Sequence, residues 1–130
     1  MMMKVAVATN GTDLDSDVHP RLGRCQVFII VDTESMNFSP FPNEGFYLSK
    51  NAGVKAAQAM IDRGVEAVVA GFIGHKAYKV FNDAKIKMYL GSLGTVRETI
   101  NAVKCGRLKD VDDLNTRNRF DMRIDRWRKG

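Results

Sequence analysis

The residues from Gly71 to Lys76 have the types and spacing of an anion-binding turn. They read Gly-Phe-Ile-Gly-His-Lys and directly follow the short apolar run of residues 67–70. A glycine-rich turn between a strand and a helix leaves backbone N–H groups unpaired at the helix start, and such groups attract anions. The alternative is a tight turn that needs glycine only for its backbone shape. The predicted anion cradle consists of Gly71, Phe72, Ile73, Gly74, His75 and Lys76.

Common nucleotide-binding and nuclease motifs do not explain this turn. Neither GxGxxG nor GxxxxGK[ST] occurs, so the dinucleotide fingerprint and the P-loop are excluded. A metal-dependent nuclease needs several carboxylates clustered on adjacent strands. The alternating Asp13, Asp15 and Asp17 instead fall in a polar loop and lack the glycine and final glutamate of a calcium loop.

Five apolar runs are expected to form the strands that position the turn. They are residues 4–9, 27–32, 36–41, 66–70 and 85–89. The second and third runs are a hairpin length apart, which favours antiparallel pairing, whereas strands that alternate with helices favour parallel pairing. The sequence therefore predicts an α/β fold with a five-stranded mixed sheet and helices on its faces.

Three helices are expected from the apolar spacing and from end signals. Ser49 or Asn51 can cap the first helix, which ends before Gly64. The third opens with the capping box of residues 95–98 and ends before Gly106. The expected inner faces are Val54, Ala57, Met60 and Ile61 for the first helix, Ala77, Val80, Phe81 and Ala84 for the second, and Val96, Thr99, Ile100 and Val103 for the third.

Composition points to one globular domain. The chain has 130 residues, of which 45% are apolar and 27% charged. No apolar run approaches the roughly 20 residues of a membrane span, and the N-terminus lacks a signal-peptide pattern. We therefore expect a cytoplasmic protein without a membrane partner. Cys25 and Cys105 have no zinc-type spacing.

The positive charge is concentrated near the C-terminus. The net charge is +5, of which residues 1–103 carry +1 and residues 104–130 carry +4. Nucleic acid is not an expected partner, because acids are interleaved and no aromatic platform occurs. We expect a domain at residues 1–106 and a basic extension at 107–130, which packs on a second copy of the chain or is loosely attached.

Several short segments, in order and spacing, resemble the dinitrogenase iron–molybdenum cofactor biosynthesis family over about residues 4–108. The resemblance implies a ribonuclease H-like fold with strand order 3-2-1-4-5, strand 2 antiparallel and three helices, and it does not imply nuclease activity. The matching segments are residues 4–8, Leu22-Gly23-Arg24, residues 27–32, residues 52–58, Gly71-Phe72-Ile73-Gly74 with Ala77, residues 86–89, and Gly94-Thr95-Val96 with Glu98.

The first loop departs from the family pattern at a position that bears on metal binding. The family commonly has His-Phe-Gly-Arg where this chain has residues 21–24, so the histidine is replaced by Arg21, which has no lone pair to give. His19 or Cys25 could supply a metal ligand instead, because imidazole and thiolate suit iron, molybdenum or copper. Positive surroundings would favour the thiolate of Cys25. The alternatives are a solvated His19 and a small buried Cys25.

The strand order implied by the resemblance places further residues beside the turn. Ligands of α/β sheets bind at the carboxyl ends of strands where connections diverge. The additional cofactor-binding positions expected there are Asn10, Arg21, Arg24, Gly91, Gly94 and Thr95.

These observations lead to a prediction of function. No catalytic constellation stands out, so we expect a binding protein and not an enzyme. The first hypothesis is a carrier or assembly protein for an anionic iron–molybdenum or related metal–sulfur cluster, with cofactor donor or acceptor proteins as partners. The second is a regulatory or protein-interaction domain that kept the fold without a cluster.

Overall fold

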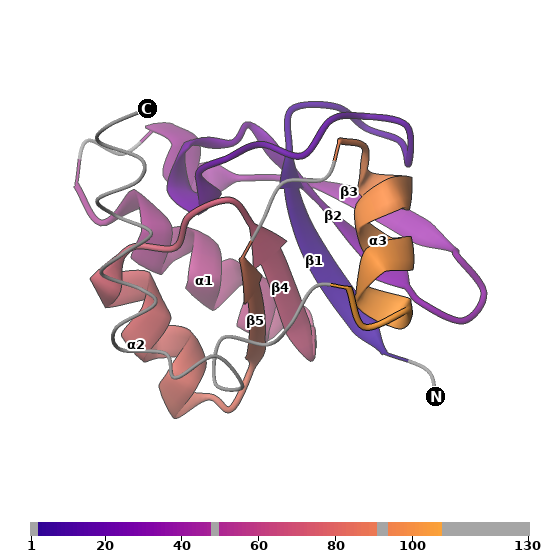
Figure 1. The fold of residues 1–130 in the computed structure, drawn as a ribbon. Coiled ribbons are helices and arrows are strands. Elements are labelled where there is room, and N and C mark those ends of the chain that lie inside the picture. The colour runs from indigo at the N-terminus through magenta and orange to yellow at the C-terminus, as the bar shows by residue number, and fades with distance from the viewer. Residues whose placement is uncertain (1–2, 48–49, 91–93, 108–130) are drawn as a thin grey trace, which may run out of the picture.

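The computed structural model describes residues 3–47, 50–90 and 94–107. Its centre is a twisted five-stranded sheet (Figure 1). The strands lie in the order β3-β2-β1-β4-β5. They are β1 (Lys4–Thr9), β2 (Val27–Asp32), β3 (Phe38–Pro42), β4 (Ala67–Ala70) and β5 (Lys87–Leu90).

Strand β1 is where the pairing changes from antiparallel to parallel. It pairs antiparallel with β2, with Lys4 opposite Asp32 and Thr9 opposite Val27, and parallel with β4. Strand β2 is also antiparallel to β3, and β4 is parallel to β5. The predicted strand order and the antiparallel second strand are confirmed, whereas the ribonuclease H-like name stays a prediction.

Helices cover both faces of the sheet. Within the described residues they are α1 (Ala52–Asp62), α2 (His75–Asp83) and α3 (Val96–Lys104). Helices α1 and α2 lie side by side on one face, and α3 lies on the other (Figure 1). Two short 3-10 turns, η1 (Leu22–Arg24) and η2 (Glu44–Tyr47), contact α1.

Alternate residues of the strands build two separate cores. In β1, Ala6 and Ala8 belong to the core under α1 and α2, whereas Val5 and Val7 belong to the core under α3. Because both of their faces are buried, the central strands β1, β2 and β4 are apolar in their interiors and do not alternate with polar residues, whereas the edge strand β3 is mostly exposed. This explains the continuous apolar runs in the sequence.

Three predicted strand starts are wrong. Met36 has a φ of 63° and its N–H donates to the carbonyl of Asp32 in the turn, so β3 begins only at Phe38. Lys85 has a φ of 61° and β5 begins at Lys87. A positive φ is incompatible with an extended strand. The third wrong start differs by one residue, since β4 begins at Ala67 and was expected to begin at residue 66.

The predicted inner faces of α1 and α2 are partly wrong. Val54 and Ile61 of α1 are only half-buried, whereas Ala56 is fully buried. In α2, Val80 is half-buried, and Ala84 is exposed just beyond the helix. The two helices pack against each other as well as on the sheet, so their buried sides include small alanines at the contact. For α3 the prediction is confirmed, since Val96, Thr99, Ile100 and Val103 are all buried.

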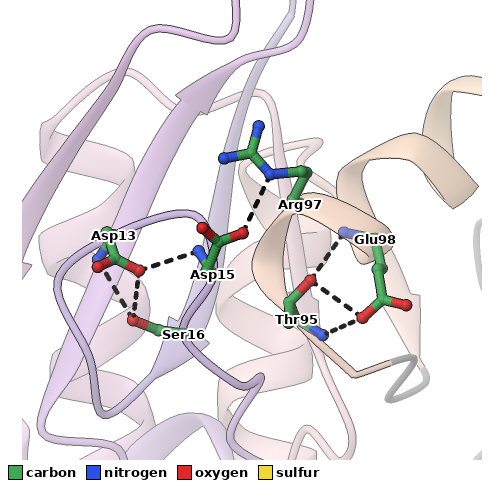
Figure 2. A network of polar contacts seen from close by, with 6 residues as sticks. All are labelled: Asp13, Asp15, Ser16, Thr95, Arg97 and Glu98. Atoms are coloured by element: carbon green, nitrogen blue, oxygen red, sulfur yellow. Dashed lines mark hydrogen bonds and ion pairs between the residues drawn. The ribbon is translucent and has the colours of Figure 1, made fainter.

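The predicted ends of the helices are mostly confirmed. Gly64 and Gly106 have φ values of 78° and 77° just after α1 and α3, where only glycine is unstrained. Thr95 and Glu98 form the capping box of α3, each side chain accepting from the other residue's backbone N–H (Figure 2). Asn51 precedes α1, but its side chain makes no capping bond.

Thr99 carries a buried hydroxyl without a partner. Thr99 belongs to α3, its side chain is fully buried, and Oγ1 has no hydrogen bond within the described residues. An unpaired buried hydroxyl costs about 1–3 kcal/mol. We expect Thr99→Val, which keeps the shape, to raise the free energy of unfolding by about 1 kcal/mol in urea denaturation.

Thr9→Val is the matched control for this prediction. The hydroxyl of Thr9 donates to the carbonyl of Asp17 at 2.7 Å and accepts from the N–H of Gly11 at 3.1 Å. The same substitution should therefore lower stability at position 9. A loss of stability in both variants would show that the Thr99 hydroxyl has a partner.

One sequence prediction, the C-terminal extension, concerns residues outside the described ranges, and another, on membrane spans, concerns the helices within them. The extension was predicted to begin at residue 107, and its role as an interface falls on residues 108–130, which lie outside the described residues. No helix in the described ranges is long and apolar enough to cross a membrane.

Candidate functional site

A cleft opens where the first turns of α1 and α2 meet η1. Its volume is about 370 Å³, within the range of small-ligand sites. Residues 21–24, 51–54, 72 and 74–77 line it. Three separate segments of the chain therefore build one site near the carboxyl edge of β1 and β4.

Glycines allow η1 and η2 to lie directly against the start of α1. A Cβ on Gly23 would lie 2.7 Å from the backbone nitrogen of Gly53, and a Cβ on Gly45 would lie 2.5 Å from the carbonyl oxygen of Ala52. Side chains do not tolerate such distances to backbone atoms. The first turn of α1 is thus held between two short turns that need glycine at these contacts.

The loop that carries Arg21 and Arg24 is attached to the sheet by its backbone. The N–H of His19 donates to the carbonyl of Ala8 at 2.7 Å, and the N–H of Leu22 donates to that of Phe72 at 3.4 Å. Arg21 also forms a parallel bridge with Phe72. These contacts hold the two arginines beside the glycine-rich turn after β4.

Two helix starts lie along the same cleft. Asn51 precedes α1 and Gly74 precedes α2, and neither provides a side-chain cap. The first N–H groups of a helix have no partner within the helix, and the N-terminal end of its dipole is positive. Backbone donors of residues 52–54 and 75–77 are therefore combined with two positive helix ends, an arrangement that favours an anion.

The charged side chains along the cleft are all basic. Arg21, Arg24 and Lys76 line it together with His75, and none of the thirteen described residues on its walls is acidic. The ammonium of Lys76 donates to Oδ1 of Asn51 at 3.3 Å and so connects the two helix starts. Side chains and backbone both select for a negatively charged ligand.

The structure brings about half of the predicted site residues together. Gly71 and Ile73 are buried and do not line the cleft. The sequence reasoning missed the start of α1, although a glycine at position 53, two residues after the expected cap Asn51, was a signal of close backbone approach. The predicted residues on the cleft are Arg21, Arg24, Phe72, Gly74, His75 and Lys76.

The other predicted cofactor-binding residues lie away from this cleft. Oδ1 of Asn10 accepts from the N–H of Gln26 at 2.9 Å, and the carbonyl of Gly94 accepts from the N–H of Val18 at 2.9 Å. Thr95 caps α3. None of the three lines the cleft, and Gly94 and Thr95 lead into α3, which covers the opposite face of the sheet from α1 and α2. Their role in cofactor binding stays a prediction. Gly91 lies outside the described residues.

The aspartates of the first loop attach it to α3. Arg97 Nε donates to Oδ1 of Asp15 at 3.1 Å, and Oδ1 of Asp13 accepts from the N–H of Asp15 and the hydroxyl of Ser16 (Figure 2). The carboxylates of Asp13 and Asp15 are therefore used in loop and helix contacts, in agreement with their interpretation as a solvated loop.

Cys25 is a buried thiol and not a thiolate at the cleft. Its side chain is fully buried, and Sγ donates to the carbonyl of Leu22 at 3.2 Å. Burial raises the pKa of the thiol to about 11, against smaller lowering effects of bonds with Thr9 and Asn43. The expectation that positive surroundings favour the thiolate is wrong, because desolvation outweighs them.

His19 lies on the loop but does not line the cleft. Its Nδ1 accepts from the backbone N–H of Arg21 at 3.0 Å, and the residue is half-buried. Within the described residues, no three His, Cys, Asp or Glu side chains are grouped so that they could hold a metal ion. The sequence proposes Cys25 or His19 as a metal ligand, and this stays a prediction; neither residue lines the cleft.

The raised pKa of Cys25 predicts a loss of stability at alkaline pH. The thiol ionises at an ordinary pKa of 9.0 when unfolded and at about 11 when folded. Its contribution is fully present below pH 9.0 and is lost as the pH rises to about 11, by about 2–3 kcal/mol. The difference in unfolding free energy between the natural chain and Cys25→Ala should therefore shrink across this window. A constant difference would contradict the assignment.

The fold and the cleft define a small α/β domain with a basic cleft at the starts of two helices. A sequence profile described as dinitrogenase iron-molybdenum cofactor matches residues 3–106. The chain belongs to this family. The match ends where the described domain ends, close to the last residues of α3.

Solved structures and one further relative agree with the family assignment. The chain is 31% identical to the orange protein of Desulfovibrio gigas, solved in its apo form, with a TM-score of 0.80 and coverage of 85% and 93% of the two chains. It is 36% identical to a NifB-like protein of Thermotoga, with a TM-score of 0.73 and coverage of 85% and 94%. An uncharacterised protein of Methanocaldococcus jannaschii is 29% identical over 114 residues, which are 85% of this chain and 93% of that one.

Proposed function

We propose that the protein carries an anionic metal–sulfur cluster, of the iron–molybdenum type or a related one, during cofactor assembly. The observation that carries this proposal is the cleft, in which basic side chains from two segments meet two uncapped helix starts without an acidic residue on its described walls. Membership of a family described by the iron–molybdenum cofactor supports this choice of anion. The protein acts by binding and not by catalysis.

The cluster would be held by charge and by backbone N–H groups. Arg21 and Lys76 would offset its negative charge, and the N–H groups at the starts of α1 and α2 would donate to its sulfur or oxygen atoms. A direct bond from Cys25 to metal is not part of the proposal, because this thiol is buried and protonated at neutral pH. Such binding is reversible, which suits a protein that must hand over its cargo.

The alternative function is a regulatory or protein-interaction domain without a cluster. The observation that favours it is the lack of any group of three potential ligand side chains in the described ranges. A cluster bound only by charge and backbone N–H groups would also require no group of ligand side chains. The metal content of the purified protein therefore distinguishes the carrier function from the regulatory one.

The test is to purify the protein without oxygen from cells supplied with iron and molybdenum. Metal analysis and the visible spectrum should then show both colour and metal. A second assay titrates the metal-free protein with thiomolybdate, a small sulfur-rich anion, and follows its absorbance. A colourless protein that also does not bind thiomolybdate would support the regulatory function instead.

A further inference from the structure

Three exposed lysines lie just outside the cleft. Lys50 directly precedes Asn51, and Lys55 and Lys79 each lie one helical turn beyond cleft-lining residues of α1 and α2. Residues three and four apart share a helix face, so Lys79 follows Lys76 and His75 along α2, and Lys55 follows the cleft-lining Asn51 and Ala52 along α1. We call Lys50, Lys55 and Lys79 the rim lysines.

The charge of the rim lysines is hardly neutralised within the described part of the chain. Lys55 contacts Glu44 at 3.8 Å, and both side chains are largely exposed, so the pair is weak. Neither Lys50 nor Lys79 has a carboxylate partner among the described residues. The nearby Lys76 contacts the neutral amide of Asn51.

Acidic residues are mostly placed elsewhere. The described ranges contain ten, and Glu44 is the one in contact with a rim lysine. The nine others lie in residues 13–17 and α3, in the turn at the end of β2, and around the C-terminal ends of α1 and α2. The surface that surrounds the cleft is therefore positive, whereas other parts of the molecule are mixed or acidic.

We propose that the rim lysines are a docking surface for a carboxylate-rich protein, the donor or acceptor of the cluster. This rests on the proposed function, because a cluster in the cleft neutralises the lining cations but not the rim. Positive charge around the mouth would steer an acidic surface over it and align the two sites for transfer. The patch extends only from Lys50 to Lys55 and Lys79 near the starts of two helices, and it does not form a groove long enough to follow a nucleic-acid backbone.

The experiment uses the full chain and a labelled oligoglutamate peptide, followed by fluorescence anisotropy. The double variant Lys55→Glu and Lys79→Glu should bind the peptide about tenfold more weakly. The matched control is Lys87→Glu with Lys104→Glu, two exposed lysines at the start of β5 and the end of α3. It has the same net charge and should lose less than about threefold. Thiomolybdate binding should also change less than about threefold in both variants, since none of these lysines lines the cleft.

Three outcomes decide the proposal. Equal loss of peptide binding in both double variants would overturn it, because the effect would then follow net charge and not position. A labelled oligouridylate serves as a nucleic-acid probe in the same assay. If the rim variant weakened the binding of this probe more than the binding of the peptide, the proposal would also be overturned, in favour of nucleic acid. If the natural chain bound the peptide through the rim lysines but did not bind thiomolybdate, the result would support the docking surface and overturn the cluster function.

Discussion

The double variant Arg21→Gln and Lys76→Gln is expected to bind thiomolybdate about a hundredfold more weakly than the natural chain. Both side chains line the cleft, one from the first loop and one from the start of α2. A hydrogen bond to a charged group contributes about 1.5 kcal/mol, so the loss of two amounts to about 3 kcal/mol, or about a hundredfold in Kd. Titration followed by absorbance measures the effect.

The control for this variant removes the same charge away from the cleft. Lys87→Gln with Lys104→Gln should leave the Kd within about threefold, since exposed charges at a distance are screened by salt. The weakening in the cleft variant should itself become smaller as salt is raised. Equal affinities of the two double variants would mean that thiomolybdate does not bind in this cleft.

Val69→Asp is expected to unfold the domain. Val69 is fully buried in β4, where it pairs with Val7 and Tyr89 of the neighbouring strands and packs in the core under α3. An unpaired carboxylate in such a place costs several kcal/mol, which approaches the roughly 5–15 kcal/mol of total stability of a domain. Circular dichroism and urea denaturation should show an unfolded or severely destabilised chain.

Phe38→Asp tests whether that effect comes from burial. Phe38 begins the edge strand β3, and its side chain is 40% exposed. An aspartate there can remain hydrated, so the variant should stay folded with a loss of at most about 1–2 kcal/mol. A Val69→Asp protein as stable as Phe38→Asp would contradict the central position of β4.

Local patterns in the chain are sufficient for the elements of this fold. The continuous apolar runs reveal strands buried on both faces, because a sheet between two helical layers needs no polar side. The capping box at Thr95 and the glycines at 64 and 106 place helix ends, because these signals act within one turn of chain. The predicted strand bounds differ by more than one residue only at two starts, where Met36 and Lys85 adopt a positive φ that their residue types do not predict.

The same local signals identify part of the site. The glycine-rich turn before His75 and the arginines of the first loop could be identified as candidate anion-binding residues. Glycine at a helix start and positive charge are signals that a few neighbouring residues of the sequence contain. The family pattern added the prediction that these segments meet, and the cleft contains residues of both.

Only the tertiary structure decides which residues share the cleft and in what state. It adds the start of α1, because Gly23 and Gly53 let two backbones touch across 30 positions of sequence. It removes Gly94 and Thr95, because the helix they precede lies on the other face of the sheet. It also changes Cys25 from an expected thiolate to a buried thiol, since desolvation depends on neighbours that are distant in the chain. Burial, close approach and the choice of sheet face are long-range properties, and the spacing of residues along the chain does not contain them.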